Sequence, residues 1–391
     1  MKNRLKYPLS LFIVWHPDFA QGKEIASNLY SLFCRDVEDP LSRGLGIPVY
    51  FRSKSFNKVP ISIDSLNASR NAIVLLIDQN YFIDDNFRAY TEELNKLVDP
   101  NTRIYPIALC EQAYEINCGL NSYQFIRAFK GDLNLEDNFD FAKKKIKTEL
   151  LHDCARLLMN FQPTWMDKTS DSKNSPVQLF LSHAKKDGLD TTKRFKAFVD
   201  DNLKLDVFFD TVDIADGYEF DQQIEASIKN SAVVVFHTDE YSSREWCRIE
   251  VLIAKRNKCS IVVIHDIKHG EKRAFPYLGN TPTITMQEDE YESFYEIVNL
   301  TLYQVLNNLF QLELLESFHK QFSIEGTEFI SLTSPPELFN YIDIYKKKAE
   351  TKNQLIVLYP EPPLGNEELR ILNEIDKDIK FITPILLPML T

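Results

Sequence analysis

The chain has 391 residues, of which 44% are hydrophobic and 12% aromatic, and its net charge at pH 7 is −12. This composition is typical of a globular protein with sizeable cores, and the length suggests two or three domains. The negative charge argues against general binding of nucleic acid or another polyanion, and no hydrophobic run approaches the roughly 20 residues that span a bilayer.

The chain starts with a basic and then hydrophobic stretch, MKNRLKYPLSLFIVWHPD. It lacks the long hydrophobic run and the small-residue cleavage site of a signal peptide, so we interpret it as a first strand. None of the six cysteines belongs to a CxxC pair. Reduced thiols are expected, and with them a cytoplasmic protein without membrane association.

Short hydrophobic segments alternate with helical stretches through the first 165 residues, which we predict to be one domain. The predicted strands are Leu11–His16, Pro48–Arg52, Ala72–Asp78, Arg103–Leu109 and Tyr123–Phe129, and the predicted helices are Lys23–Val37, Ser62–Arg70 and Asn138–Met159. Such alternation favours a parallel sheet covered by helices.

A polar segment, MDKTSDSKNSP, predicts a linker at 166–176. The alternation then resumes over a second predicted domain, 177–312. Its predicted strands are Gln178–His183, Asp206–Asp210, Ala232–Thr238 and Ser260–His265, and its predicted helices are Thr191–Asn202, Asp221–Lys229, Ser243–Arg256 and Glu290–Asn308.

The two halves indicate a duplication. Ile63–Phe82 aligns with Ile224–Ser242 with a one-residue gap, which places Tyr81 on Tyr241. After Leu312 the pattern predicts a small C-terminal α/β module, 313–391, which we expect to dock on the second domain or on a partner because a unit of this size is marginally stable alone. The expected fold is therefore α/β, with two flavodoxin-like parallel sheets and this module.

Several common site motifs are absent from the sequence. There is no Walker loop, no GxSxG elbow, and "RGLGIPV" does not complete a GxGxxG fingerprint. The acidic residues before Gly217 are spaced by three instead of the two that a calcium loop requires, and the histidines lack metal-ligand spacing. We therefore expect no metal and no cofactor.

The carboxyl ends of the predicted strands carry a more informative set of residues. Doubly wound sheets bind ligands at this edge, where Ser182 and Asp210 fall, with Glu250 on a following helix. Gly217 permits a tight backbone path, and Phe220 offers an aromatic ring. One carboxylate among aromatic side chains suits cleavage of a glycosidic bond whose leaving group departs as a neutral base, as in nicotinamide ribosides.

Residues 177–264 resemble a TIR domain of the bacterial type. "LFLSHAKKD" is similar to the first TIR box, "FFDTVDIADGYEFDQQIEASIKNSAVVVFHT" to the BB loop with its helix, and "YSSREWCRIEV" to the tyrosine-serine-tryptophan-cysteine-glutamate signature. The resemblance implies cleavage of NAD⁺, as substrate, to nicotinamide and ADP-ribose or a cyclic variant. It assigns Glu250 as catalytic carboxylate and Trp246, Phe220, Asp210, Ser182, Lys185 and Gly217 as substrate-binding residues.

The first domain resembles a divergent TIR-like domain. Its corresponding helix reads "NFRAYTEEL", in which no Trp stands four residues before Glu92 or Glu93, so we predict no active site there. The resemblance also implies self-association through TIR domains. Joined to a sensor or activator that docks on either terminal part, such a chain would be a regulated prokaryotic immune effector against phage.

Structural roles compete with each of these assignments. A helix glutamate such as Glu250 is usually solvated, Trp246 and Phe220 could be core residues, Ser182 could cap a loop, and Lys185 could be a solvated cation. Many TIR domains only assemble with other TIR domains, so a non-catalytic scaffold is the alternative function. Release of nicotinamide from NAD⁺ separates the two.

Overall fold

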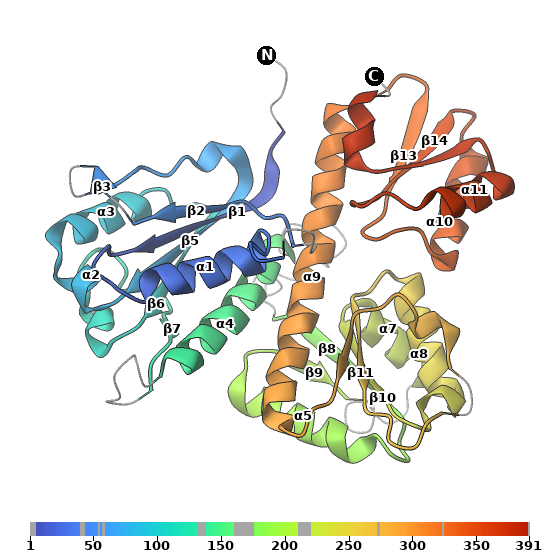
Figure 1. Ribbon diagram of the computed structural model, residues 1–391, viewed down its shortest axis with the longest axis horizontal. Coiled ribbons are helices and arrows are strands. Elements are labelled where there is room, and N and C mark those ends of the chain that lie inside the picture. Colours follow the sequence, from blue (N-terminus) through green and yellow to red (C-terminus); the bar gives the residue numbers. More distant parts are fainter. Residues whose placement is uncertain are drawn as a thin grey trace. The chain divides into compact units, whose positions relative to one another are not determined.

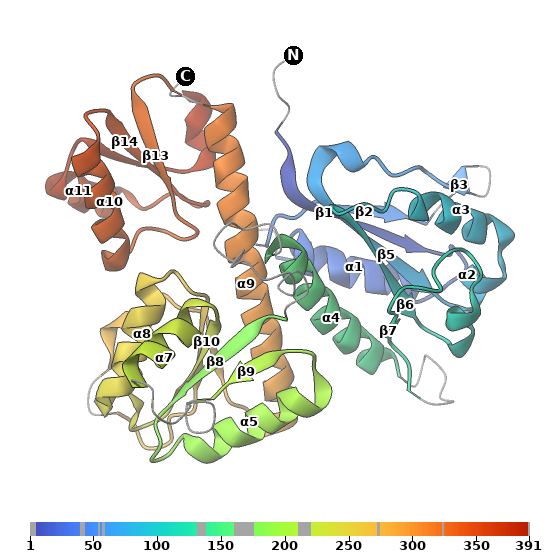
Figure 2. The same ribbon diagram turned by 180° about the vertical axis from the view of Figure 1, so that it is seen from behind.

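The computed structural model describes residues 5–39, 44–53, 55–56, 59–130, 138–159, 176–209, 220–271, 274–322 and 324–389. The chain divides into two compact units, which are described separately (Figures 1 and 2). Unit 1 combines Met1–Leu158 with Phe310–Ser323, and unit 2 combines Met159–Leu309 with Ile324–Thr391.

Unit 1 is built on a parallel sheet of five strands in the order β2-β1-β5-β6-β7. The strands are β1 (Tyr7–Trp15), β2 (Val49–Arg52), β5 (Ala68–Ile77), β6 (Thr102–Ala108) and β7 (Ile126–Arg127), with a small antiparallel hairpin of β3 (Ser55–Phe56) and β4 (Val59–Pro60) after β2. All but the first residue of β1 and all but the second of β5 are buried. Continuous burial of this kind is expected for central parallel strands that are covered on both faces.

The helical elements of this unit are α1 (Gly22–Phe33), α2 (Gln79–Ile83), α3 (Asp85–Asn95) and α4 (Phe139–Met159), with 3-10 turns η1 (Ser65–Asn67) and η2 (Glu111–Glu115). Successive residues of β5 face opposite sides of the sheet. On one side, Leu75 and Ile77 pack in a core cluster with Phe87 and Tyr90 of α3. The amphipathic helix α3 is therefore fixed by the sheet, and its buried side faces β5.

The helix predicted over Ser62–Arg70 is wrong. The structure forms only the 3-10 turn η1 there. The Asp64 side chain caps this turn by accepting a hydrogen bond from the Leu66 N–H. Ala68 already belongs to β5, where it pairs with Tyr7 of β1. Because β1 begins as early as Tyr7, its backbone supplies ladder partners that replace the helical hydrogen bonds.

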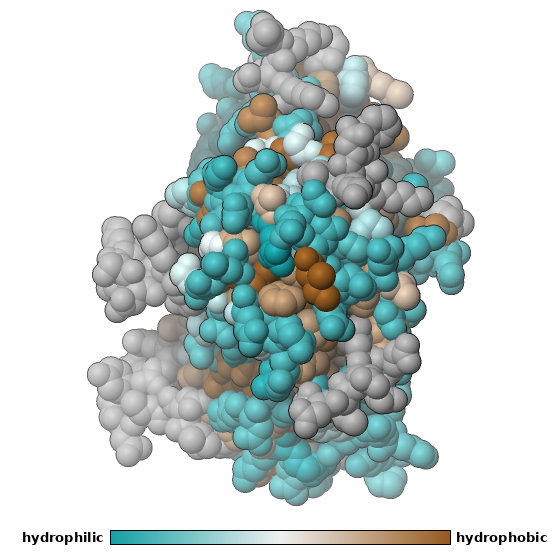
Figure 3. All heavy atoms as spheres, turned by 90° about the vertical axis from the view of Figure 1, so that its left-hand side faces the viewer, coloured by the Kyte–Doolittle hydropathy of each residue, from teal (hydrophilic) through white to brown (hydrophobic). Residues whose placement is uncertain are grey.

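Figure 3 shows the side of the molecule that lies at the left in Figure 1, where unit 1 is drawn. This face is mostly hydrophilic, with a small group of hydrophobic residues near its centre. Isolated exposed hydrophobic side chains are normal on a water-facing surface.

Unit 2 contains a second parallel sheet, in the order β12-β11-β10-β8-β9. Its strands are β8 (Gln178–His183), β9 (Asp206–Phe208), β10 (Ala232–His237), β11 (Ile261–His265) and β12 (Thr283–Thr285), and its helical elements are α5 (Leu189–Asn202), α7 (Phe220–Lys229), η4 (Tyr241–Ser243), α8 (Glu245–Arg256) and η5 (Pro276–Leu278). When the five strands of each sheet are numbered in chain order, both sheets have the order 2-1-3-4-5. This is the flavodoxin-like order, so the predicted fold class is confirmed.

Residues 324–389, which we call the C-terminal module, form a third parallel sheet in the order β13-β14-β15. Its elements are β13 (Thr327–Ser331), α10 (Leu338–Glu350), β14 (Gln354–Leu358), α11 (Asn366–Ile375), β15 (Ile379–Ile382) and η6 (Pro384–Met389). A small core that includes Ile344, Val357, Tyr359 and Ile379 holds it together.

The long helix α9 (Glu290–Gln321) begins in unit 2 and ends in unit 1. Its last part is tied to unit 1 by an ion pair in which Arg70 Nη1 donates to Glu313 Oε2 over 2.5 Å, with both side chains largely buried. The predicted boundary at Leu312 therefore falls inside a helix. Within the described ranges, no helix is both long and hydrophobic enough to cross a membrane.

Candidate active site

A carboxylate is buried at the carboxyl end of the unit 2 sheet. Glu250 lies in the second turn of α8 and is only 6% exposed. Ser182, the last residue but one of β8, donates a hydrogen bond from its Oγ to Glu250 Oε2 over 2.5 Å. A buried carboxylate is normally satisfied by such donors, and in this site the donor comes from the strand edge where α/β sheets bind ligands.

Tyr241 completes this arrangement from a third element, η4. Its phenol oxygen lies 2.5 Å from Ser182 Oγ and is fully buried. Because serine has a single proton and gives it to the carboxylate, Tyr241 is the donor in its contact with Ser182, and the backbone oxygen of Cys247 is a second, more distant acceptor at 3.3 Å. Burial raises the pKa of Tyr241 well above its usual value, and the neighbouring Cys247 and Glu250 raise it further, so the phenol keeps its proton. The result is an ordered chain of donors from Tyr241 through Ser182 to Glu250.

One contact joins α8 to the end of β8, and a second joins the end of β8 to the residue after β9. Cys247 is buried and its Sγ donates to the backbone oxygen of His183 over 3.4 Å. The ring of His183 in turn stacks on Phe209 at a centroid distance of 5.0 Å. Cys247 is thus a small buried packing residue between α8 and the end of β8.

Trp246 stands one helical turn before Glu250 and is 44% exposed. Residues i and i+4 of a helix share one face, so the indole lies on the same side of α8 as the carboxylate but nearer to solvent. Trp246 is therefore not a core residue. An exposed aromatic face beside a buried carboxylate is available to a planar ligand.

The remaining predicted site residues are placed less completely. Lys185 is exposed in the turn that follows β8. Phe220 is the first residue of α7, and its side chain is not described. Asp210 and Gly217 lie outside the described residues. The structure therefore brings together Glu250, Ser182 and Trp246, and it adds Tyr241, which the sequence marked only as part of the repeat and the signature.

A second polar cluster lies at the ends of the next two strands. His237 Nε2 is 3.0 Å from Glu271 Oε2, to which Ser242 also donates over 2.6 Å. The ring of His265 lies 5.2 Å from that of His237. Burial lowers the pKa of His265, and the neighbouring His237 lowers it further, while Glu271 acts in the opposite direction. No group of three or more metal-binding side chains occurs among the residues that the structure describes.

The corresponding positions of unit 1 show what the site lacks there. Helices α3 and α8 both begin four residues after a buried tyrosine, Tyr81 or Tyr241, and each buries its third, sixth, seventh and tenth residues. The sixth residue of α8 is Glu250, whereas the sixth residue of α3 is Tyr90. By the pairing of the strands, Val14 stands where Ser182 does. Unit 1 therefore has no counterpart of the Glu250 carboxylate and none of the Ser182 hydroxyl.

Comparison with known proteins assigns part of unit 2 to a family. Residues 179–298 match the model of the TIR domain. No curated protein matches the chain.

The solved structures that are similar to the chain include the TIR domains of the activated Roq1 resistosome that directly recognizes the pathogen effector XopQ. The match has 17% identity and a TM-score of 0.21, and covers 34% of this chain and 84% of that one. A Clostridium novyi NT protein described as a tagatose-6-phosphate ketose/aldose isomerase matches at 8% identity and a TM-score of 0.20, over 76% and 78% of the two chains. TM-scores this low carry no argument about activity. The family model identifies residues 179–298 as a TIR domain, and within them the signature lies on η4 and α8.

Proposed function

We propose that this protein is an NAD⁺ glycohydrolase that uses Glu250 to release nicotinamide from NAD⁺, giving ADP-ribose or a cyclic variant. The observation that carries the proposal is the buried Glu250 carboxylate, held by Ser182 at the ligand-binding edge of the sheet. Nicotinamide leaves as a neutral base, so the reaction needs negative charge near the ribosyl cation more than it needs a general acid.

Each residue of the cluster has a distinct part in this proposal. Glu250 stabilises the developing oxocarbenium ion and accepts hydrogen bonds from ribose hydroxyls. Ser182 and Tyr241 act as positioning residues, because their donor chain fixes the carboxylate before the substrate arrives. Trp246 offers an exposed aromatic face to the departing ring. The nucleophile is water, or the adenine of the substrate in a cyclising reaction.

The wider biological role is part of the same proposal. The protein acts in the cytoplasm as a regulated prokaryotic immune effector against phage, and it is activated when TIR domains associate. Unit 1 is a TIR-like domain without an active site, because Tyr90 and Val14 replace the carboxylate and the hydroxyl. A sensor or activator protein docks on unit 1 or on the C-terminal module.

Nicotinamide release from NAD⁺ by the purified full chain tests the proposal. The reaction is run at high protein concentration and with a crowding agent, so that association is not limiting. Wild type is compared with Glu250→Gln and with the matched control Glu245→Gln, an exposed glutamate in the first turn of the same helix. We expect Glu250→Gln to lose about a hundredfold or more in rate and Glu245→Gln to keep the wild-type rate.

Mass spectrometry of the second product then distinguishes linear from cyclic ADP-ribose. Equal rates in wild type and Glu250→Gln, with both folded by circular dichroism, would exclude Glu250 as the catalytic residue. No release under any condition, together with concentration-dependent association in light scattering, would instead favour a TIR scaffold.

A further inference from the structure

The C-terminal end of α8 is held by a residue outside the TIR domain. Lys255, five residues after Glu250 on this helix, donates from Nζ to both carboxylate oxygens of Glu337, over 3.1 and 2.9 Å. The Lys255 side chain is 10% exposed and that of Glu337 is 26% exposed. Solvent and salt screen a charge pair with this little exposure far less than one on the surface. Removal of one partner therefore leaves the other charge poorly compensated.

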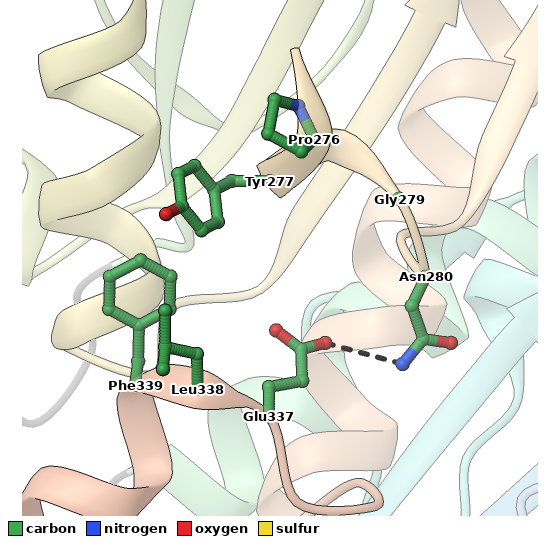
Figure 4. A pocket seen from close by; sticks show the side chains of 7 residues that line it. All are labelled: Pro276, Tyr277, Gly279, Asn280, Glu337, Leu338 and Phe339. Carbon is green, nitrogen blue, oxygen red and sulfur yellow. Dashed lines mark hydrogen bonds between the residues drawn. The ribbon is translucent and has the colours of Figure 1, made fainter.

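Glu337 connects three segments of unit 2 at once. It is the N-cap of α10, where its backbone oxygen accepts from the Asn340 N–H while the Asn340 side chain accepts from the Glu337 N–H. It also accepts from Asn280 Nδ2 over 3.3 Å (Figure 4). Glu337 therefore connects α8 and the segment after η5, through its carboxylate, to the start of α10, of which it is the N-cap.

The packing around this carboxylate is not continuous. A cavity of about 420 Å³ lies beside it, lined by Pro276, Tyr277, Gly279, Asn280, Glu337, Leu338 and Phe339 (Figure 4). Across the cavity from Glu337, the rings of Tyr277 and Phe339 meet edge to face at 5.3 Å. Because close-packed contact is interrupted at this cavity, the connection between the module and α8 is concentrated in a few side chains, with Glu337 at their centre.

The position of these contacts along α8 matters for the site. Lys255 lies in the last turn of the helix and Lys258, which pairs with Asp343 of α10 over 2.9 Å, follows the helix end. Trp246 lies in the first turn, at the opposite end of the helix, and is exposed. The Lys255 contact thus holds one end of α8, whereas the half-exposed Lys258 pair adds little, and the indole at the other end stays accessible.

We propose that Glu337 of the C-terminal module is a positioning residue for the TIR active site: through Lys255 it holds α8, and with it the Glu250 carboxylate, in register with Ser182 on β8. The catalytic part of this inference rests on the proposed NAD⁺ cleavage. A helix moves largely as a rigid element, and a displacement of about 1 Å at a catalytic group is enough to lower the rate by one to two orders of magnitude. Docking of the module therefore supports activity.

Two single variants and their combination test this in the full chain. Glu337→Gln keeps the shape of the side chain and the backbone contact that caps α10 but loses the charge, and Lys255→Met keeps the aliphatic stem but loses the ammonium. We expect each to lower kcat for nicotinamide release about tenfold with KM unchanged, and the double variant to be no slower than either single variant, because both remove one interaction. Lys258→Met is the control, since its pair with Asp343 is half exposed on both sides and of little strength.

Hydrogen–deuterium exchange supplies a readout that does not depend on NAD⁺ chemistry. The amides of α8 should exchange faster in Glu337→Gln and Lys255→Met than in wild type, while those of β10 stay protected. Unchanged exchange in α8 overturns the proposal whatever the activity, and so does an unchanged kcat in a wild type that cleaves NAD⁺. If no form cleaves NAD⁺, the proposed function fails separately, and faster exchange still supports the restraint of α8 by Glu337.

Discussion

Tyr90 of α3 occupies the helical position that Glu250 occupies in α8. Both are the sixth residue of a helix that follows a buried tyrosine, both are buried, and both helices pack on a sheet with the same strand order. The Tyr90 phenol donates to the backbone oxygen of Ile61 over 3.0 Å. One copy of the duplicated fold thus uses this position for packing, and the other keeps a carboxylate there.

This equivalence predicts that unit 1 cannot be made active by one exchange. In the Glu250→Gln background, Tyr90→Glu should not restore nicotinamide release, because Val14 stands where the serine donor would have to be. Tyr90→Phe in the wild-type chain should keep the full kcat. The rates of the variants are measured against wild type and Glu250→Gln. A rate in the double variant above that of Glu250→Gln would contradict the assignment.

The donor chain to Glu250 predicts graded losses of activity. Ser182→Ala removes a direct donor to the buried carboxylate and should lower kcat by about ten- to a hundredfold, since a hydrogen bond to a charged group contributes about 1.5–3 kcal/mol. Tyr241→Phe removes the donor to Ser182 and should have a smaller effect in the same direction. Steady-state kinetics and thermal melts are compared for each variant.

Tyr81→Phe is the matched control in unit 1. Its phenol lies 2.7 Å from Thr91 Oγ1 and is fully buried, so its loss should lower the free energy of unfolding by about 1 kcal/mol. It should leave kcat unchanged. Loss of activity in this control equal to that in Tyr241→Phe would mean that the tyrosines act through stability alone.

The buried ion pair on α9 predicts a strong effect on stability. Glu313→Gln removes the carboxylate that pairs with the largely buried guanidinium of Arg70 and should lower the free energy of unfolding of unit 1 by roughly 3 kcal/mol. The double variant Arg70→Met with Glu313→Leu should recover much of this loss, since neither charge is then buried. Urea unfolding of the full chain measures both. If the double variant lost as much free energy of unfolding as Glu313→Gln, the shape of the two side chains and not their charge would account for the stability of this contact.

The cluster at the ends of β10 and β11 predicts a pH effect on stability. The pKa of His265 in the folded protein is lowered by burial and by His237, so the folded state resists its protonation more than the unfolded state does. Its contribution to stability is complete above the ordinary value of about 6.5 and declines as the pH falls through the lowered folded pKa.

The variant His265→Asn isolates this contribution. The difference in unfolding free energy between wild type and variant, measured at about pH 7.5 and about pH 5.5, should shrink or reverse at the lower pH. A difference that does not change with pH would mean that His265 does not titrate in this range.

Much of the architecture could be predicted from the sequence, because buried parallel strands appear in it as short runs of hydrophobic residues. The strands predicted at Gln178–His183 and Ala232–Thr238 agree with β8 and β10 to within one residue, whereas the one predicted at Leu11–His16 begins four residues earlier, at Tyr7. Where local pattern and long-range pairing compete, the prediction failed. Ser62–Arg70 has a helical pattern, yet its last residues belong to β5, because they pair with Tyr7 and Leu9 of β1 in the parallel sheet.

For the candidate site, the sequence by itself determined the residue types: the signature singled out Glu250 and Trp246, and the first TIR box singled out Ser182. Only the tertiary structure decided their relations, that Tyr241 donates through Ser182 to a buried Glu250, that Tyr90 is its counterpart, and that Glu337 holds α8. These contacts join residues up to 82 positions apart. The reason is physical: sequence patterns report which side chains leave water, whereas partners across a core are set by strand order and register, which no local pattern contains.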